Sequence, residues 1–410
     1  MPKENSKLIP EVNIGIVGHV DHGKTTLASA LTGKFTDEHS EELKRGITIR
    51  LGYADVTLRK CPKCEANLSY STFDKCFYCG SDTKILRTVS FVDVPGHETL
   101  IATVLTGSAL MDGALLLVAA NEKCPQPQTA EHLEALNIAG IKNIIIIQNK
   151  IDLVSKEEAL ANFKEIKKFV KGSVAEGAPI IPVSAIHRSN IGMIFKTIED
   201  AIKTPSRDDK KSPKMLVARS FDVNRPGTEI KSLTGGIIGG GLVEGTLSVG
   251  DEIEICPGIN ENNKWTPVTA RVESVNQGSH KVKTGRPGGL LAIGTSLDPS
   301  MTKSDNLASM VVGKPGTLPS LRDEISLDIN LLEKAVGSGN GPDSGLNIRQ
   351  NDVLLMNAGT QKTIGVCVAP GKTSKFTLKR PLCVEVGDKV VLSKQINARW
   401  RLIGWGVFKG

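Results

Sequence analysis

A glycine-rich run near the N-terminus constrains the fold of this chain more than any other feature. It extends from Gly18 to Thr25, reads GHVDHGKT and matches G-x-x-x-x-G-K-[ST], the pattern of loops that cradle nucleotide phosphates. Gly18 and Gly23 allow the backbone to turn sharply, so that its N–H groups point inward at oxygen atoms. Lys24 brings a compact charge to the β- and γ-phosphates. Thr25 offers a hydroxyl to Mg²⁺, so the run predicts a site for a nucleotide and its metal.

The residues on either side of this loop supply its structural context. An apolar run over 12–17 predicts the strand before the loop, and residues 26–31 predict the helix after it, with Gly33 near the C-cap. The positive end of that helix faces the anion. A chance match within a flexible turn is the alternative, and the order of strand, loop and helix disfavours it. We therefore expect a doubly wound α/β domain with a mostly parallel sheet.

Three further motifs each follow an apolar run that predicts a strand. They begin at Asp93 (DVPG), Asn149 (NKID) and Ser184 (SA). The carboxyl ends of parallel strands meet at one edge of an open sheet, which is where α/β domains bind their ligands. The three motifs and the phosphate loop therefore predict a single nucleotide site. The apolar runs are residues 89–92, 144–147 and 180–183.

The residues after the apolar run 144–147 predict which purine is bound. A buried Asp152 carboxylate can accept hydrogen bonds from guanine N1–H and the N2 amine, a donor pair that adenine lacks. Asn149 can hold the purine edge, and the stem of Lys150 can lie over the ring. The ligand is therefore expected to be GTP or GDP. The predicted nucleotide contacts are Asp21, His22, Gly23, Lys24, Thr25, Thr26, Asp93, Gly96, Asn149, Lys150, Asp152, Ser184, Ala185 and Ile186.

Two segments between these motifs are expected to respond to the γ-phosphate. A hydroxyl at Thr48 can ligate Mg²⁺ only while the γ-phosphate holds its segment, and the Gly96 N–H can donate to the same phosphate. His97 follows directly, and its imidazole could orient the attacking water or stabilise charge. The alternative for His97 is a surface residue at a helix start. The side chains of His19 and His22 are expected to be loop residues and not ligands.

Four of the eight cysteines form two Cys-x2-Cys pairs with eleven residues between them. Thiolates at i and i+3 of a tight turn can face one tetrahedral Zn²⁺, and two such turns close a structural site. A pair of disulfides or plain buried thiols are the alternatives. No secretory signal precedes the pairs, which disfavours disulfides. The predicted zinc ligands are Cys61, Cys64, Cys76 and Cys79, within an insert over 58–85; Cys124, Cys256, Cys367 and Cys383 are expected to be small buried apolar residues.

The chain changes character after about residue 204. Helical stretches over 156–171 and 192–203 alternate with strands before that point, whereas short β-rich runs punctuated by glycine follow it. A polar, proline-bounded run between the two regions is typical of a linker, and a second one lies near 313–319. The later region is expected to form β-barrels. The predicted divisions are a disordered tail (1–11), an α/β domain (12–204), a linker (205–214), a first barrel (215–320) and a C-terminal barrel (321–410).

Charge and composition narrow the partners. The net charge of +7 and the pI near 8.9 permit a polyanionic partner without requiring one. Aromatic residues make up only 4%, which favours structured RNA over stacked single strands. No run of eighteen apolar residues occurs, so we expect no transmembrane helix, no membrane partner and a cytoplasmic location.

Taken together, the motifs resemble those of the translational GTPases around elongation factor Tu. The shared motifs are GHVDHGKTT, RGITI, DVPGH and NKID. Within that superfamily the chain is most similar to the gamma subunits of archaeal and eukaryotic initiation factor two. Lys123 and Val94 depart from the pattern, but neither position touches the phosphate chemistry. The stretches that carry the closer similarity are HSEELKRG (39–46), AANE (119–122), PQPQT (125–129) and INARWRLIGWG (396–406).

This resemblance implies a GTPase domain followed by two β-barrels. It further implies a GTP-hydrolysing carrier of initiator methionyl-tRNA that works with alpha and beta subunits and delivers the tRNA to the small ribosomal subunit. Thr25 and Thr48 would bind Mg²⁺, His97 would position water, and the zinc site would be structural. Some members also suggest a second cation between Asp21 and the Gly46 carbonyl.

Two other functions remain open at this point. An elongator or selenocysteinyl-tRNA carrier belongs to the same class, although the paired cysteines and the arginine–tryptophan run near the C-terminus argue against it. The GTPase subunit of a sulfate-adenylylating enzyme belongs to a different class and would not bind tRNA. Arg399, Trp400 and Arg401 could contact RNA, contact a protein, or lie in the barrel core with their charged ends at the surface.

Overall fold

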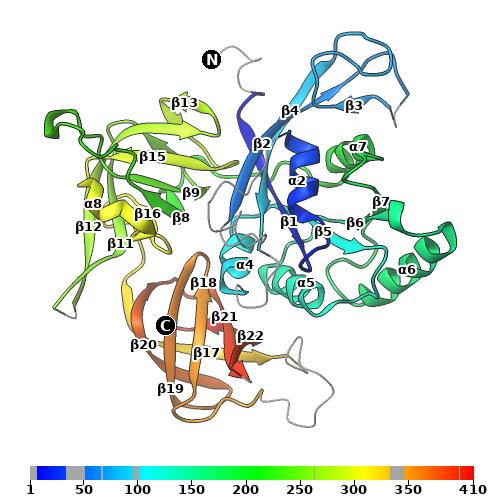
Figure 1. The fold of residues 1–410 in the computed structure, drawn as a ribbon. Helices are drawn as coiled ribbons and strands as arrows, with labels where there is room; N and C mark the ends of the chain where they lie inside the picture. Colours follow the sequence, from blue (N-terminus) through cyan, green and yellow to red (C-terminus); the bar gives the residue numbers. More distant parts are fainter. Residues whose placement is uncertain are drawn as a thin grey trace. The chain divides into compact units, whose positions relative to one another are not determined.

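The computed structural model describes residues 7–33, 51–65, 68–95, 101–262, 264–332, 346–396 and 398–410, apart from the side chains of Ile101 and Ile230. The chain divides into two compact units, Met1–Pro205 and Ser206–Gly410. Each unit has its own sheets and helices, which Figure 1 labels.

The N-terminal unit is an α/β domain built on one sheet of seven strands in the order β3-β2-β4-β1-β5-β6-β7. Strands β4, β1, β5, β6 and β7 run parallel, whereas β2 runs antiparallel to β4 and β3 antiparallel to β2. The expected doubly wound, mostly parallel sheet is therefore confirmed. Its elements are β1 (Pro10–Gly18), α2 (Lys24–Thr32), β2 (Gly52–Lys60), β3 (Tyr70–Ser71), β4 (Lys84–Asp93), α4 (Ile101–Ser108), β5 (Gly113–Ala119), α5 (Pro127–Ala139), β6 (Ile144–Asn149), the 3₁₀ helix η2 (Ile151–Leu153), α6 (Lys156–Phe169), β7 (Ile180–Pro182) and α7 (Ile191–Ala201).

Both faces of this sheet are covered by helices, because its central strands are apolar on both sides. Ile14 and Ile16 of β1 pack with Leu27 of α2 and Ile194 of α7 in one continuous core cluster. The helix α5 also contacts β1 and β5, but its residues lie outside that cluster, and α5 packs with α4 on the opposite face (Figure 1). A central parallel strand buried on both faces requires such near-continuous apolar runs.

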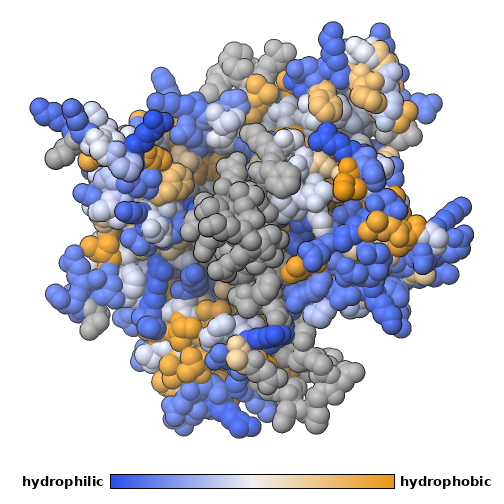
Figure 2. Space-filling model, in the orientation of Figure 1, coloured by the Kyte–Doolittle hydropathy of each residue, from blue (hydrophilic) through white to orange (hydrophobic). Residues whose placement is uncertain are grey.

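The helix α6 illustrates how local sequence sets an element's bounds. Ser155 caps the helix, since its hydroxyl accepts a hydrogen bond from the Glu158 amide at 3.2 Å and the Glu158 carboxylate accepts one from the Ser155 amide at 2.8 Å. Lys167 and Lys168 lie in the last turn, where the helix dipole favours positive charge. Figure 2 shows a largely hydrophilic surface over α6, interrupted by an apolar patch.

The N-terminal tail is shorter than expected, because the folded domain begins before residue 12. β1 begins at Pro10, two residues before the predicted domain start at 12. Lys7 is already held, because its carbonyl accepts a hydrogen bond from the Thr88 hydroxyl at 2.8 Å. The Glu11 carboxylate accepts a hydrogen bond from the Thr204 hydroxyl at 2.6 Å. These contacts join Lys7 to β4 and Glu11 to the segment after α7, so the disorder expected for 1–11 does not extend through residues 7–11.

The C-terminal unit contains two β-barrels. In the first, the strands follow the order β11-β16-β8-β9-β15-β12, and pairing of β11 with β12 closes the ring. Its elements are β8 (Lys214–Phe221), the 3₁₀ helix η3 (Ile230–Ser232), β9 (Ile237–Glu244), β10 (Leu247–Ser248), β11 (Glu252–Glu261), β12 (Lys264–Gln277), β13 (His280–Val282), β14 (Thr284–Gly285), β15 (Leu291–Thr295), α8 (Pro299–Thr302), the 3₁₀ helix η4 (Lys303–Asp305) and β16 (Val311–Gly313).

The second barrel is a closed ring of six strands in the order β17-β20-β19-β18-β21-β22. Its core includes Phe376 and Phe408, both almost completely buried. The expected architecture of an α/β domain followed by two barrels is thus confirmed. The strands are β17 (Leu321–Leu331), β18 (Val353–Ala358), β19 (Gln361–Ala369), β20 (Thr373–Cys383), β21 (Lys389–Ile396) and β22 (Arg399–Phe408).

The arginine–tryptophan run lies at the start of β22, paired with the end of β21. Arg401 is only 8% exposed, so its stem contributes to the barrel, as the barrel interpretation predicts. Arg399 is exposed and Trp400 is half-buried. Contact of these two with RNA or with a protein stays a prediction.

The predicted linkers coincide with short connections. Part of the first linker is held against the first barrel, where the Gly245 amide donates to the Asp208 carbonyl at 3.2 Å. β8 already includes Lys214, and the second barrel begins with β17 at Leu321. Among the described helices, none has both the length and the apolar character that crossing a membrane would require.

Candidate functional site

The phosphate loop of the N-terminal unit depends on two glycines for steric reasons that the structure makes explicit. Gly18 and Gly23 have φ values of 146° and 87°. A Cβ at Gly18 would lie 2.6 Å from the Leu117 carbonyl oxygen, and one at Gly23 would lie 2.5 Å from Nδ2 of Asn149. A larger residue at either position would collide with these groups, so the loop can approach β5 and β6 this closely only with glycine.

The start of α2 carries the features of an anion site. Its N-terminus takes no side-chain cap and has no acidic residue in the first turn, which leaves the positive end of the helix dipole to a ligand. Lys24 is buried at the first helical position, and its Nζ donates a hydrogen bond to the His19 carbonyl at 2.7 Å within the loop. An ammonium group held over the loop in this way suits phosphate oxygens.

Thr25 and Asp93 converge beside this loop. The Thr25 hydroxyl donates to Oδ2 of Asp93 at 3.1 Å, and Asp93 at the end of β4 is completely buried. A hydroxyl and a buried carboxylate are oxygen donors of the type that Mg²⁺ binds directly or through water. The residues present therefore fit a Mg²⁺ ion bound with a nucleotide phosphate.

Asn149 joins three of the predicted motifs. Its Nδ2 donates to the His22 carbonyl at 2.9 Å, and its Oδ1 accepts from the Ala185 amide at 3.1 Å. The side chain therefore ties the phosphate loop to the loop after β7, a role that the sequence motif did not reveal. Its contact with the purine edge stays a prediction.

Asp152 lies on the 3₁₀ turn η2 directly after β6. A hydrogen bond from the Ser184 side chain lowers the pKa of the Asp152 carboxyl, and electrostatic interactions with His187 and Lys150 act in the same direction. His187 Nε2 lies 3.9 Å from Oδ2 of Asp152. The carboxylate is thus ionised at neutral pH beside the Ser184 loop. Asp152 is exposed, however, and not buried as expected, so its contact with guanine stays a prediction.

The ligand contacts of several predicted residues stay predictions. Asp21 is exposed on the phosphate loop, Thr26 is exposed in the first turn of α2, and Ile186 is 71% exposed on the 184–186 loop. Gly46, Thr48, Gly96 and His97 lie outside the described residues, so the switch, the water-positioning histidine and the second cation between Asp21 and Gly46 stay predictions.

Two contacts of the phosphate loop were missed by sequence reasoning. The Gly18 amide donates to Nδ1 of His132 in α5 at 2.9 Å. His22, expected to be an ordinary loop residue, is completely buried with Nδ1 3.0 Å from the Leu117 carbonyl oxygen and Nε2 3.4 Å from the Glu122 carboxylate. Neither pairing has a sequence signal, because the partners are separated by 114 and 95 residues.

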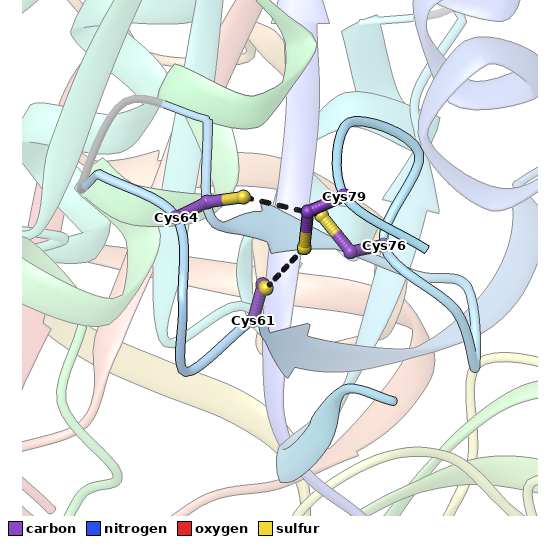
Figure 3. A group of neighbouring side chains, drawn as sticks. All are labelled: Cys61, Cys64, Cys76 and Cys79. Carbon is purple, nitrogen blue, oxygen red and sulfur yellow. Dashed lines mark hydrogen bonds between the residues drawn. The ribbon is translucent and has the colours of Figure 1, made fainter. Parts of the chain in front are cut away.

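The four cysteines of the insert come together as predicted. Figure 3 shows Cys61 and Cys64 on one loop facing Cys76 and Cys79 on another. The sulfurs of Cys61 and Cys79 are 3.4 Å apart, those of Cys64 and Cys76 are 3.6 Å apart, and all four lie within 4.8 Å of one another. Four thiolates around one Zn²⁺ at about 2.3 Å would be about 3.8 Å apart. The cluster therefore fits a structural zinc ion.

The backbone and the acidity of the thiols support the same interpretation. Gly80 has a φ of 67° and its amide donates to the Cys76 carbonyl at 2.9 Å, which closes the second turn. Hydrogen bonds from Ser81 lower the pKa of Cys79 to about 6, whereas hydrogen bonding to Cys79 raises the pKa of Cys64 to about 12. Thiols this close cannot all ionise unless a cation balances their charge.

The remaining cysteines behave largely as expected. Cys256, Cys367 and Cys383 are buried, and Cys124 is half-buried. All eight are free thiols, so the disulfide alternative has no support in the structure.

Comparison with protein families divides the chain in the same way. The elongation factor Tu GTP-binding domain matches residues 10–204. The C-terminal domain of initiation factor eIF2 gamma matches residues 323–408.

Curated relatives match the whole length. The chain is 54% identical to translation initiation factor 2 subunit gamma of Methanocaldococcus jannaschii, with 100% of each chain covered. It is 54% identical to the protein of the same name from Pyrococcus horikoshii, with 97% of each covered, and 53% identical to that of Methanothermobacter thermautotrophicus, with 97% of this chain and 99% of the relative covered.

Solved structures share the fold at lower identity. The bacterial selenocysteine-specific elongation factor EF-Sec has a TM-score of 0.75 at 24% identity, covering 97% of this chain and 58% of that one. The elongation factor SelB of Methanococcus maripaludis, in complex with the GTP analogue GppNHp, has a TM-score of 0.71 at 22% identity, covering 98% of this chain and 79% of that one.

Proposed function

The chain belongs to the gamma subunits of translation initiation factor 2, and from this premise we propose that it carries initiator methionyl-tRNA in its GTP-bound state. In the proposed cycle it works in the cytoplasm with alpha and beta subunits, delivers the tRNA to the small ribosomal subunit and hydrolyses GTP. The observation that carries the proposal is identity of 54% along the entire chain, so that both the GTPase unit and the C-terminal barrel are shared.

The nucleotide site supports this function through groups that the fold already positions. Lys24 and the start of α2 attract the phosphates, and the ionised Asp152 selects guanine. Thr25 and Asp93 would hold Mg²⁺ directly or through water, and the ion would neutralise charge between the β- and γ-phosphates. Asn149 holds the phosphate loop and the 184–186 loop together, so that phosphate and base are bound in one fixed geometry.

In the proposed switch, Thr48 and Gly96 contact the γ-phosphate end of GTP and are released when it is hydrolysed. His97 orients the attacking water. The GTP-ordered segments favour a protein conformation that binds the acceptor arm of the tRNA, whereas with GDP the tRNA must itself supply the free energy of ordering. The cysteine cluster, with zinc bound, holds the 58–85 insert in shape.

A titration of methionylated initiator tRNA tests the function directly. With a non-hydrolysable GTP analogue the tRNA should bind more tightly than with GDP, by about 5- to 150-fold, the usual size of such coupling. Elongator tRNA is the control, and affinity for the initiator should fall as salt rises because phosphate contacts dominate. Addition of the alpha subunit should raise the affinity further.

The alternative functions give different results in the same experiment. Equal affinity with GDP and the GTP analogue would contradict the switch. Preference for elongator or selenocysteinyl-tRNA would identify a carrier of that kind. An absence of tRNA binding, together with capture of a sulfurylase, would identify the subunit of a sulfate-adenylylating enzyme.

A further inference from the structure

Two buried imidazoles hold opposite ends of the phosphate loop. His132 of α5 is 2% exposed, and its Nδ1 accepts a hydrogen bond of 2.9 Å from the Gly18 amide at the start of the loop. His22, near the end of the loop, is 0% exposed, and its Nδ1 is 3.0 Å from the Leu117 carbonyl oxygen of β5. Both ends are thus joined to elements that carry none of the predicted nucleotide contacts.

The hydrogen-bond partners determine the protonation of each ring. A backbone amide can only donate, so Nδ1 of His132 must carry no proton, and the ring is neutral with its proton on Nε2. A carbonyl can only accept, so Nδ1 of His22 carries the proton. Burial, together with a smaller effect of the positive charge of Lys24, lowers the pKa of His132 to about 3, which keeps the acceptor lone pair available at neutral pH.

The contact to His132 decides the direction of the Gly18 amide. Gly18 is the first glycine of the loop and has a φ of 146°, a conformation at the edge of the region that only glycine adopts readily. A buried amide in this position needs an acceptor, and among the described contacts of the Gly18 amide that acceptor is His132. Without it, the amide would be buried unsatisfied or the loop would move to find water.

We propose that His132 is a positioning residue for nucleotide binding, which sets the path of the phosphate loop by accepting the Gly18 amide hydrogen bond and does not itself touch the nucleotide. The inference rests on the GTPase assignment alone and is independent of tRNA binding. It predicts that the acceptor atom matters more than the size or shape of the side chain.

Two substitutions of His132 distinguish the effect of its hydrogen-bond acceptor atom from the effect of its packing. His132→Asn places an amide oxygen where Nδ1 stood and can keep the hydrogen bond, whereas His132→Leu fills similar volume and removes the acceptor. His280→Leu, on the exposed strand β13 of the other unit, is the matched control. Affinities for GDP and for a non-hydrolysable GTP analogue, with the GDP dissociation rate, are measured for all four proteins.

The expected result is a loss of about tenfold in affinity for both nucleotides in His132→Leu, by the same factor because the loop binds both. His132→Asn should stay within about threefold of the wild type, and His280→Leu should be unchanged. Hydrogen exchange of the Gly18 amide should be slow in the wild type and in His132→Asn and fast in His132→Leu. A merely structural role would change the melting temperature without this pattern.

Two outcomes would overturn the proposal. One is wild-type affinity in His132→Leu; the other is an equal loss in both variants while the Gly18 amide stays protected, which would indicate packing. If His132→Leu does not fold, the wild type itself supplies the test through the nitrogen–nitrogen coupling across the hydrogen bond. No detectable coupling between Gly18 N and His132 Nδ1 would then rule the contact out.

Discussion

The Thr25 hydroxyl lies 3.1 Å from the Asp93 carboxylate, although 68 residues separate them along the chain. The pair forms because β1 and β4 are neighbours in the sheet and their carboxyl ends meet at one edge. This arrangement presents two oxygen donors to a single cation beside the phosphate loop.

Substitution of Asp93 should weaken Mg²⁺ binding. Asp93→Asn keeps the size of the side chain but removes its charge, so the Mg²⁺ concentration that half-maximally slows GDP release should rise about 10- to 100-fold. The measurement is a magnesium titration of the GDP dissociation rate. Asp200→Asn, on the exposed part of α7, should leave the titration unchanged. An unaltered magnesium requirement in Asp93→Asn would remove Asp93 from the metal site.

The Asp152 carboxylate should determine which purine base the site binds. Asp152→Asn replaces an acceptor oxygen with an amide donor, so the variant should lose at least about 100-fold in GTP affinity and gain affinity for xanthosine triphosphate, whose O2 replaces the N2 amine. Competition between the two nucleotides measures the change. If the variant still prefers GTP, Asp152 does not recognise the purine base.

Protein purified without added metal should contain about one zinc ion per chain, as elemental analysis can determine. Cys61→Ser should reduce the zinc content and make the 58–85 insert sensitive to proteolysis. GTP affinity should stay within about tenfold of the wild type, because none of the four cysteines belongs to the phosphate site. Well-folded, zinc-free protein with four reduced thiols would contradict the prediction.

Hydrolysis should depend on His97 more than binding does. His97→Ala should slow GTP hydrolysis at least about tenfold and leave GTP affinity near the wild-type value, since the residue acts on water and not on the ground-state phosphates. Single-turnover hydrolysis and equilibrium binding provide the two readings. The wild-type rate without a stimulating partner should itself be low. Loss of binding and hydrolysis together would falsify this role.

Acid should destabilise the N-terminal unit partly through His132. The folded-state pKa of about 3 lies below the ordinary value of 6.5, so between these two the unfolded chain binds a proton that the folded chain does not. The contribution of neutral His132 to the free energy of unfolding is therefore fully present above about pH 6.5. It is lost as the pH falls, by at most about 1.4 kcal/mol per pH unit. The titratable groups that face this ring are Lys24, His19 and His22.

Comparison of the wild type with His132→Asn isolates the contribution of His132 to the pH dependence of stability. Thermal unfolding of the apo protein between pH 7 and pH 4 should show a shallower decline for the variant than for the wild type. Parallel curves for the two proteins would show that His132 is not the titrating group. Asp152, whose pKa is lowered, affects both proteins equally and only at lower pH.

Sequence alone determined what depends on local chemistry. Gly18 and Gly23 are dictated by backbone turns that other residues cannot make in that space, and the apolar runs predicted β1 and β6 because a strand buried on both faces must be apolar throughout. The spacing of Cys61 and Cys64 predicted a metal knuckle because two thiols at i and i+3 share one face of a turn. The motifs also predicted that the bound purine is guanine and that the chain belongs among the translational GTPases.

Tertiary structure alone decided which distant groups meet. Asn149 bonds to the His22 carbonyl across 127 residues, and Gly18 bonds to His132 across 114, through contacts that no local pattern encodes. The burial of His22 illustrates the reason: a histidine in a glycine-rich loop suits solvent equally well, and the Leu117 carbonyl that accepts the hydrogen bond from its Nδ1 comes from a strand 95 residues away. Partners for buried polar groups are supplied by the packing of whole elements, so the local sequence predicted the ligand while the fold decided how its loop is held.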